Sequence, residues 1–328
     1  MNQNILVTGG TGYVGCVLTP KLLKLGYNVR VLDIMWFGEE CTKQFEDHPD
    51  CELIQGDIRD ETIVKRALAG IDTVIHLAAI SNDPCSDLNP KLTQQVNYDA
   101  VKSLVRLSKN SGVRRFIGAS SSSVYGIKSE PDVTEDLPLE PITLYAKLKA
   151  ATEPIILTEK SADFVPVCIR SATVCGYSPR MRLDLTVNIL TSHAVNKGLI
   201  TVFGGQQKRP NIHIDDITDL YALLVEAPAE KIAGEVFNAG GDNYRVIEIA
   251  EMAREVVGGD VKIEIADVID ERSYHISSEK IKNVLGFIPK RTVRDAIADV
   301  KKAFENGLIP DYQNTRYYNI KRMRELYH

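Results

Sequence analysis

Short apolar runs alternate with longer amphipathic stretches through the first half of this 328-residue chain. The runs have the length of β-strands and occupy residues 4–8, 28–33, 51–56, 72–78 and 114–119. Apolar residues recur at helical spacing over residues 13–25, 61–69, 90–111 and 142–160. This alternation predicts a parallel sheet covered by helices on both faces, with ligands at the carboxyl ends of the strands.

The rhythm loosens after another strand-like run at residues 163–170, where proline, glycine and short mixed segments become more frequent. We therefore expect an α/β fold in which a doubly wound parallel sheet of Rossmann type carries a smaller mixed α/β lobe. The expected boundaries are residues 1–170 for the sheet domain, 171–311 for the lobe, with segments returning to the first domain, and 312–328 for a polar and aromatic tail.

Composition removes several classes of function. The chain has 39 Lys and Arg against 44 Asp and Glu and no basic run, which argues against nucleic acid as a partner. No apolar stretch approaches the ~20 residues of a membrane span, and we expect a cytoplasmic protein. The six cysteines form no C-x-x-C pair, which favours reduced thiols over a disulfide frame or a zinc site, and no metal is expected.

A glycine-rich turn, TGGTGYVG, separates the first predicted strand from the first predicted helix. Gly9, Gly12 and Gly15 recur every third residue there, which permits a tight turn and brings the helix N-terminal amides close to a pyrophosphate. A plain strand-to-helix loop could show the same spacing. Asp33 at the end of the second strand strengthens the hypothesis, because a carboxylate there accepts hydrogen bonds from an adenosine ribose.

The charge of Asp33 bears on the choice of cofactor. A carboxylate at this position would repel a 2′-phosphate, so NAD is favoured over NADP, although Arg30 leaves the second possibility open. The segment GDIRD, with Asp57 and Ile58, follows the third strand and would lie beside the adenine, but it could equally be a polar turn.

Two further motifs carry candidate chemistry. Tyr145 and Lys149 are four residues apart on a predicted helix, so the ammonium can lie near the phenol and favour its ionised form. A phenol with a reference pKa of ~10 is a poor base at neutral pH without such a charge. The same spacing is common on solvated helices. The run SSSSVYG ends the fifth predicted strand and can supply a hydroxyl to a substrate oxygen.

Taken in order, TGGTGYVG, Asp33, GDIRD, HLAA, Asn97, SSSSVYG and the Tyr145/Lys149 pair resemble the extended short-chain dehydrogenases/reductases, specifically the nucleotide-sugar epimerase and dehydratase branch. The resemblance runs from residue 2 to about residue 300. It implies NAD as cofactor, bound by Gly9, Gly12, Tyr13, Val14, Gly15, Asp33, Asp57, Ile58, Leu77, Ala78, Ala79, Asn97, Tyr145 and Lys149.

The resemblance also implies catalytic roles. By register with Val124, Tyr125 and Gly126, the catalytic hydroxyl is that of Ser121, and it acts with Tyr145 and Lys149. The 4,6-dehydratases of this branch have an Asp-Glu pair after the catalytic hydroxyl residue. Ser122 and Ser123 occupy those places here, which disfavours dehydration.

The substrate expected from the resemblance is a nucleotide-diphosphate sugar. Asn188, Arg209 and Arg272 fall where relatives hold phosphate or nucleotide, although either arginine could instead form a surface ion pair. Further sugar contacts are expected from Ser81, Asn82, Ser122 and Ser123. Thr173 and Cys175 stand where Asn and Tyr are usual, which indicates an unusual sugar pocket.

The resulting hypothesis is an NAD-dependent nucleotide-sugar 4-epimerase that acts by hydride transfer at C4 through a 4-keto intermediate. A nucleotide-sugar dehydrogenase or 4-ketoreductase would use the same residues. A catalytically silent NAD sensor or scaffold is the alternative from another class. A homodimer is expected through the helices near residues 90–111 and 142–160, as in relatives with a four-helix interface.

Overall fold

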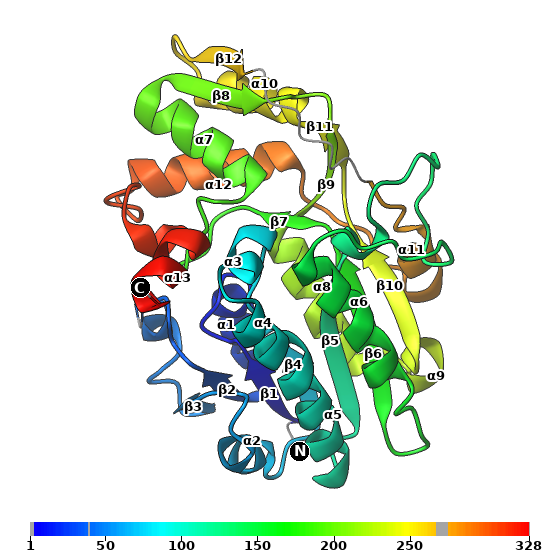
Figure 1. Cartoon of the computed structure of the whole chain (residues 1–328). Coiled ribbons are helices and arrows are strands. Elements are labelled where there is room, and N and C mark those ends of the chain that lie inside the picture. Colours follow the sequence, from blue (N-terminus) through cyan, green and yellow to red (C-terminus); the bar gives the residue numbers. More distant parts are fainter. Residues whose placement is uncertain (1–2, 39, 267–274, 328) are drawn as a thin grey trace.

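The computed structural model describes residues 3–38, 40–266 and 275–327 (Figure 1). Its centre is a parallel seven-stranded sheet with the strand order β10-β6-β5-β4-β1-β2-β3. The strands are β1 (Asn4–Thr8), β2 (Asn28–Asp33), β3 (Cys51–Gln55), β4 (Thr73–His76), β5 (Arg115–Ser121), β6 (Val165–Ser171) and β10 (Glu235–Ala239).

Helices cover both faces of this sheet. The buried side chains of α1 (Gly15–Lys24), α8 (Ile214–Glu226) and α11 (Glu279–Leu285) belong to one apolar core. Those of α2 (Glu61–Leu68), α5 (Ala100–Asn110) and α6 (Leu144–Leu157) belong to the core on the other face. This arrangement confirms the prediction of a doubly wound parallel sheet.

The strand order determines where a ligand can enter. β1 lies between β2 and β4, so the chain builds the sheet outward from β1 in both directions. In open sheets of this kind, ligands bind at the carboxyl ends of the strands, where the order reverses. Thr8, His76 and Ser121 are the last residues of β1, β4 and β5.

A smaller lobe lies beyond these carboxyl ends, at the top of Figure 1. Its core combines α7 (Thr186–Lys197), β8 (Leu199–Phe203), α10 (Val246–Val257) and α12 (Val293–Glu305). β12 (Lys262–Ala266) pairs with β8, and β7 (Thr173–Cys175), β9 (Lys208–His213) and β11 (Asn243–Arg245) form a mixed sheet. Between these lobe segments, α8, α9 (Ala229–Ile232) and β10 return to the large sheet.

The helix expected over residues 90–111 is divided. A π-helical turn, η2 (Gln95–Asp99), separates α4 (Pro90–Gln94) from α5. The turn contains Asn97, whose Oδ1 accepts from the Ile80 amide at 2.9 Å and whose Nδ2 donates to the Ile80 carbonyl at 2.9 Å. Asn97 therefore holds the loop that follows β4.

The tail forms η4 (Thr315–Tyr317) and α13 (Asn319–Tyr327). α13 lies beside α3 (Asp83–Leu88) and reaches the loop after β2, where Arg322 Nε donates to the Trp36 carbonyl at 2.7 Å (Figure 1). The remaining short elements are η1 (Thr42–Gln44) and η3 (Ser122–Tyr125). In the described part of the chain, every helix is too short or too polar to cross a membrane.

Candidate active site

A cavity of about 360 Å³ opens at the carboxyl ends of the sheet strands. It is lined by the loop after β1, the ends of β2 and β5, the segment after β4, the start of α6, the segment from Ser171 to Leu185, and Asn319. The predicted residues that it brings together are Gly9, Gly12, Tyr13, Val14, Gly15, Asp33, Asp57, Ile58, Leu77, Ala78, Ala79, Ser81, Asn82, Ser121, Ser122, Ser123, Tyr145 and Lys149.

The backbone of the glycine loop packs so closely against neighbouring backbone that two of its glycines are required. Gly9 has a φ of +76°, and a Cβ there would lie 2.6 Å from the Ala78 amide nitrogen. A Cβ on Gly15 would lie 2.4 Å from the Gly9 carbonyl oxygen, so neither glycine could carry a side chain without moving backbone. The first turn of α1 carries no acidic residue, which leaves its positive end open to a diphosphate.

The end of β2, beside the glycine loop, has the features of an adenosine site. The Asp33 carboxylate accepts from the Thr11 amide at 3.0 Å and the Met35 amide at 2.8 Å, which fixes it at the end of β2. Arg30 points elsewhere: its Nε donates to Glu52 at 2.5 Å and its Nη1 donates to the Ala67 and Ala69 carbonyls. Asp33 thus faces the cavity without Arg30, which fits a free ribose 2′-hydroxyl.

One wall of the cavity carries the three predicted catalytic residues, Ser121 from β5 and Tyr145 and Lys149 from α6. Ser121 ends β5, Tyr145 lies in the first turn of α6, and the Lys149 ammonium lies 6.0 Å from the Tyr145 ring centroid. Lys149 is 6% exposed and donates to the Ala119 carbonyl at 2.7 Å. Burial lowers the pKa of Lys149 to about 8, because the charged form loses its water.

The four serines have different surroundings. Ser120 Oγ donates to Glu153 Oε1 at 2.5 Å, and Ser122 is buried. Ser121 and Ser123 share a hydrogen bond between their hydroxyls at 3.0 Å. The motif register that assigns the catalytic role to Ser121 depends on Tyr125. The Tyr125 side chain is fully buried, and its hydroxyl donates to Asn238 Oδ1 at 2.7 Å.

Among the described residues, three predicted site residues do not line the cavity. Asn97 holds Ile80, as described above, and Arg209 lies on β9 with its Nη1 donating to the Lys208 carbonyl. Asn188 is buried: its Oδ1 accepts from the Gly176 amide, and its Nδ2 donates to Tyr13 Oη and the Arg182 carbonyl. Arg272 lies outside the described residues.

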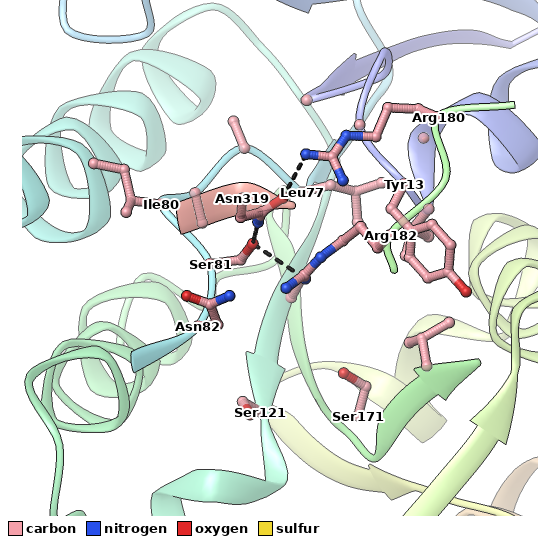
Figure 2. A pocket seen from close by; sticks show the side chains of 18 of the residues that line it. Tyr13, Leu77, Ile80, Ser81, Asn82, Ser121, Ser171, Arg180, Arg182 and Asn319 are labelled. Carbon is pink, nitrogen blue, oxygen red and sulfur yellow. Dashed lines mark hydrogen bonds between the residues drawn. The ribbon is translucent and has the colours of Figure 1, made fainter. Parts of the chain in front are cut away.

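Sequence reasoning named Ser81 but missed the polar cluster that surrounds it on the wall opposite Ser121 (Figure 2). Arg182 donates to both oxygens of Asp184, at 3.0 and 3.2 Å, and to Ser81 Oγ at 3.3 Å. Asn319 Nδ2 donates to Ser81 Oγ at 2.9 Å, and Asn319 Oδ1 accepts from Arg180 Nη2 at 2.5 Å. The basic pair in PRMR was a visible signal, but nothing in the sequence joins it to Asn319.

The doubly wound sheet with this glycine loop defines a Rossmann-type dinucleotide-binding protein. The profile of the NAD dependent epimerase/dehydratase family matches residues 5–240, and the chain belongs to that family. This confirms the resemblance to the extended short-chain dehydrogenases/reductases, the expectation of an enzyme and the choice of NAD.

Curated and solved relatives cover almost the whole chain. A UDP-glucose 4-epimerase of Lactobacillus helveticus is 31% identical over 92% of this chain and 96% of its own length. The UDP-glucuronic acid 4-epimerase of Bacillus cereus, solved with UDP-glucuronic acid and NAD, is 27% identical, with a TM-score of 0.83 over 93% of this chain and 99% of its own. The dTDP-glucose 4,6-dehydratase of Streptomyces venezuelae, solved with NAD, is 25% identical, with a TM-score of 0.84 over 93% of this chain and 98% of its own.

Proposed function

We propose that this chain is a nucleotide-sugar 4-epimerase that acts through a 4-keto intermediate. The observation that carries the proposal is the position of Ser121, Tyr145 and Lys149 on one wall of the cavity that also holds the glycine loop. The epimerases among the relatives support a nucleoside-diphosphate sugar as substrate.

The three side chains divide the proton chemistry. Ser121 donates a hydrogen bond to the sugar 4-oxygen, and the Tyr145 phenolate removes the proton of the sugar 4-hydroxyl. The Lys149 ammonium favours the phenolate by its charge. NAD, when bound, supplies the acceptor for the C4 hydride and its later donor. After the keto sugar turns its other face, the Tyr145 phenol returns the proton.

Dehydration of the sugar needs an additional acid and base. Ser122 and Ser123 stand where the dehydratases have carboxylates, and a hydroxyl cannot take either part at neutral pH. Ser122 is buried and Ser123 is bonded to Ser121, which gives both serines a local structural role. Serine in place of a carboxylate at both positions favours epimerisation over elimination.

The test is a panel of UDP-, GDP- and dTDP-linked sugars incubated with the purified protein and no added cofactor. Inversion at C4, followed by NMR, together with NAD that stays on the protein is the expected result. Turnover that requires added NAD(H) and yields a net oxidised or reduced sugar would instead identify the dehydrogenase or 4-ketoreductase.

Variants separate the roles of the wall residues. Tyr145→Phe and Ser121→Ala should each lower turnover by ~10²–10⁴-fold while NAD remains bound, because each removes a positioned proton-handling group. Ser123→Ala, which removes the neighbouring hydroxyl of the same turn, is the matched control and should be milder. A silent Ser121→Ala beside a damaging Ser122→Ala would show that the register is off by one.

We also propose a homodimer through the outer faces of α5 and α6. Val101, Leu104 and Leu107 are buried in the core of the chain itself. The interface on α5 would therefore be formed by its polar outer face, which carries Arg106 and Lys109. A monomeric mass by light scattering at micromolar concentration would remove this proposal.

A further inference from the structure

Arg180 is a buried cation whose hydrogen-bonding capacity is only partly used. It lies between β7 and α7, is 6% exposed and lines the cavity. Nη2 donates to Asn319, and the guanidinium lies 3.6 Å from the centroid of the Phe37 ring. Nε and Nη1 are buried, and neither has a hydrogen-bond partner among the described residues.

The nearby acids do not complete the site. Asp184 accepts from Arg182, from Asn82 Nδ2 at 3.2 Å and from the Asn319 amide at 3.1 Å. Asp33 is held by two backbone amides. Burial and the charge of Arg182 lower the pKa of Arg180 to about 10, against the opposing effect of Asp184, Cys16 and Asp33. Arg180 is still charged at neutral pH, and an unpaired buried charge is costly unless a ligand supplies the missing partner.

The position of Arg180 identifies the chemistry of that partner. Its guanidinium lies over the ring of Phe37, in the loop that follows β2, and Asp33 at the end of β2 lines the same cavity, which places Arg180 at the cofactor end. The glycine loop and the N-terminus of α1 line the same cavity and favour phosphate oxygens. A planar guanidinium with two nitrogens that have no partner among the described residues matches phosphate oxygens in charge and geometry.

We propose that Arg180 binds the diphosphate of NAD and that Asn319, from α13, holds the guanidinium in position for it. Figure 2 shows Arg180 and Asn319 joined at the cavity wall, and Asn319 joined in turn to Ser81. The cofactor site then includes a residue of the tail, beyond the segment 5–240 that the family profile matches. The proposal rests on NAD as cofactor and is independent of which sugar is turned over.

The test is calorimetric titration of NAD-stripped protein with four probes: NAD, ADP-ribose, adenosine and UDP. Arg180→Met should weaken NAD and ADP-ribose by roughly 10- to 100-fold, the loss expected for charged hydrogen bonds, and leave adenosine and UDP unchanged. Arg180→Lys, which keeps the charge, should recover part of the loss. Asn319→Ala removes one neutral partner and should weaken the same two probes by about two- to tenfold.

Arg324→Ala is the matched control, because it removes an exposed arginine from the same helix as Asn319. It should leave all four affinities unchanged. Unweakened NAD and ADP-ribose in Arg180→Met would overturn the proposal, and so would an equal loss of adenosine, which has no phosphate. A loss confined to UDP would assign Arg180 to the substrate diphosphate and overturn the assignment to NAD. All of these results stand whether or not C4 inversion is ever observed.

Discussion

Two buried arginines that follow one another closely in the sequence have opposite surroundings. All three guanidinium nitrogens of Arg170 have hydrogen-bond partners. Nε and Nη2 donate to the Glu153 carboxylate at 2.9 and 2.7 Å, and Nη1 donates to Tyr125 Oη at 2.7 Å. Arg180 has one hydrogen-bond partner, Asn319, among the residues that the structure covers, and two nitrogens left over.

The pKa values separate the two in the same way. Burial lowers the pKa of Arg170, but the Glu153 carboxylate and Tyr125 outweigh it and raise the pKa above its usual value. For Arg180 burial prevails and lowers the pKa, as it does for Lys149, whereas the Asp184 carboxylate raises the pKa of Arg182, a third buried cation of the cavity. A buried cation that is paired within the fold has its charge compensated without a ligand, whereas one left incomplete at a cavity wall points to a ligand.

The largest expected effect is the loss of stability when Arg170 is deprived of its carboxylate partner, and it would sharpen the contrast between Arg170 and Arg180. Glu153→Gln leaves the charge of Arg170 buried without its counterion and should lower the free energy of unfolding by about 3–5 kcal/mol. Glu159→Gln is the control, because its pair with Lys109 is exposed and should contribute about 0.2–1 kcal/mol. Urea denaturation measures both, and equal losses would show that the Arg170 network contributes no more than a surface pair.

The acidic side of the cofactor site should show the next largest effect. Asp33→Ala should weaken NAD binding by ~1.5–3 kcal/mol, the magnitude of a charged hydrogen bond, and should narrow the preference for NAD over NADP. Titration with both dinucleotides checks this. A wild-type protein that binds NADP more tightly would refute the role given to Asp33.

The pH dependence of turnover tests Lys149. Its pKa of about 8 means that the ammonium loses its proton as pH rises through 8, and the Tyr145 phenol then loses the positive charge that favours its ionisation. If the ammonium is required, turnover should fall by about tenfold one unit above that pKa. An active Lys149→Arg variant should keep its rate to higher pH, and a wild-type profile flat to pH 10 would contradict this assignment.

The smallest expected effect is on the stability of an Arg180 variant, and it tests the contrast between Arg170 and Arg180 most directly. Arg180→Met breaks no ion pair, so the free energy of unfolding of the NAD-free protein should change by less than about 1 kcal/mol, or increase. The same urea denaturation applies. A loss as large as that of Glu153→Gln would place Arg180 with Arg170, as part of the fold.

The extent of sequence prediction follows from how each part of the site is built. The glycine loop, Asp33 and the Tyr145/Lys149 pair depend on local spacing or strand ends, so periodicity and turn chemistry place them. The contact between Arg180 and Asn319 joins residues 139 positions apart, and no local pattern encodes it. Asn188 shows the converse limit, because its place near a helix start does not reveal that its amide is used by Tyr13 and Gly176.

The position of Asn319 in the chain also affects how the protein is made. Chains leave the ribosome from the N-terminus and domains fold as units while synthesis continues. All seven strands of the large sheet precede α13, so the sheet and the glycine loop can form before Asn319 has been translated. If Asn319 orients Arg180 as proposed, a nascent or prematurely terminated chain would hold NAD less firmly than the finished one. Cofactor retention would then report whether translation had reached the tail.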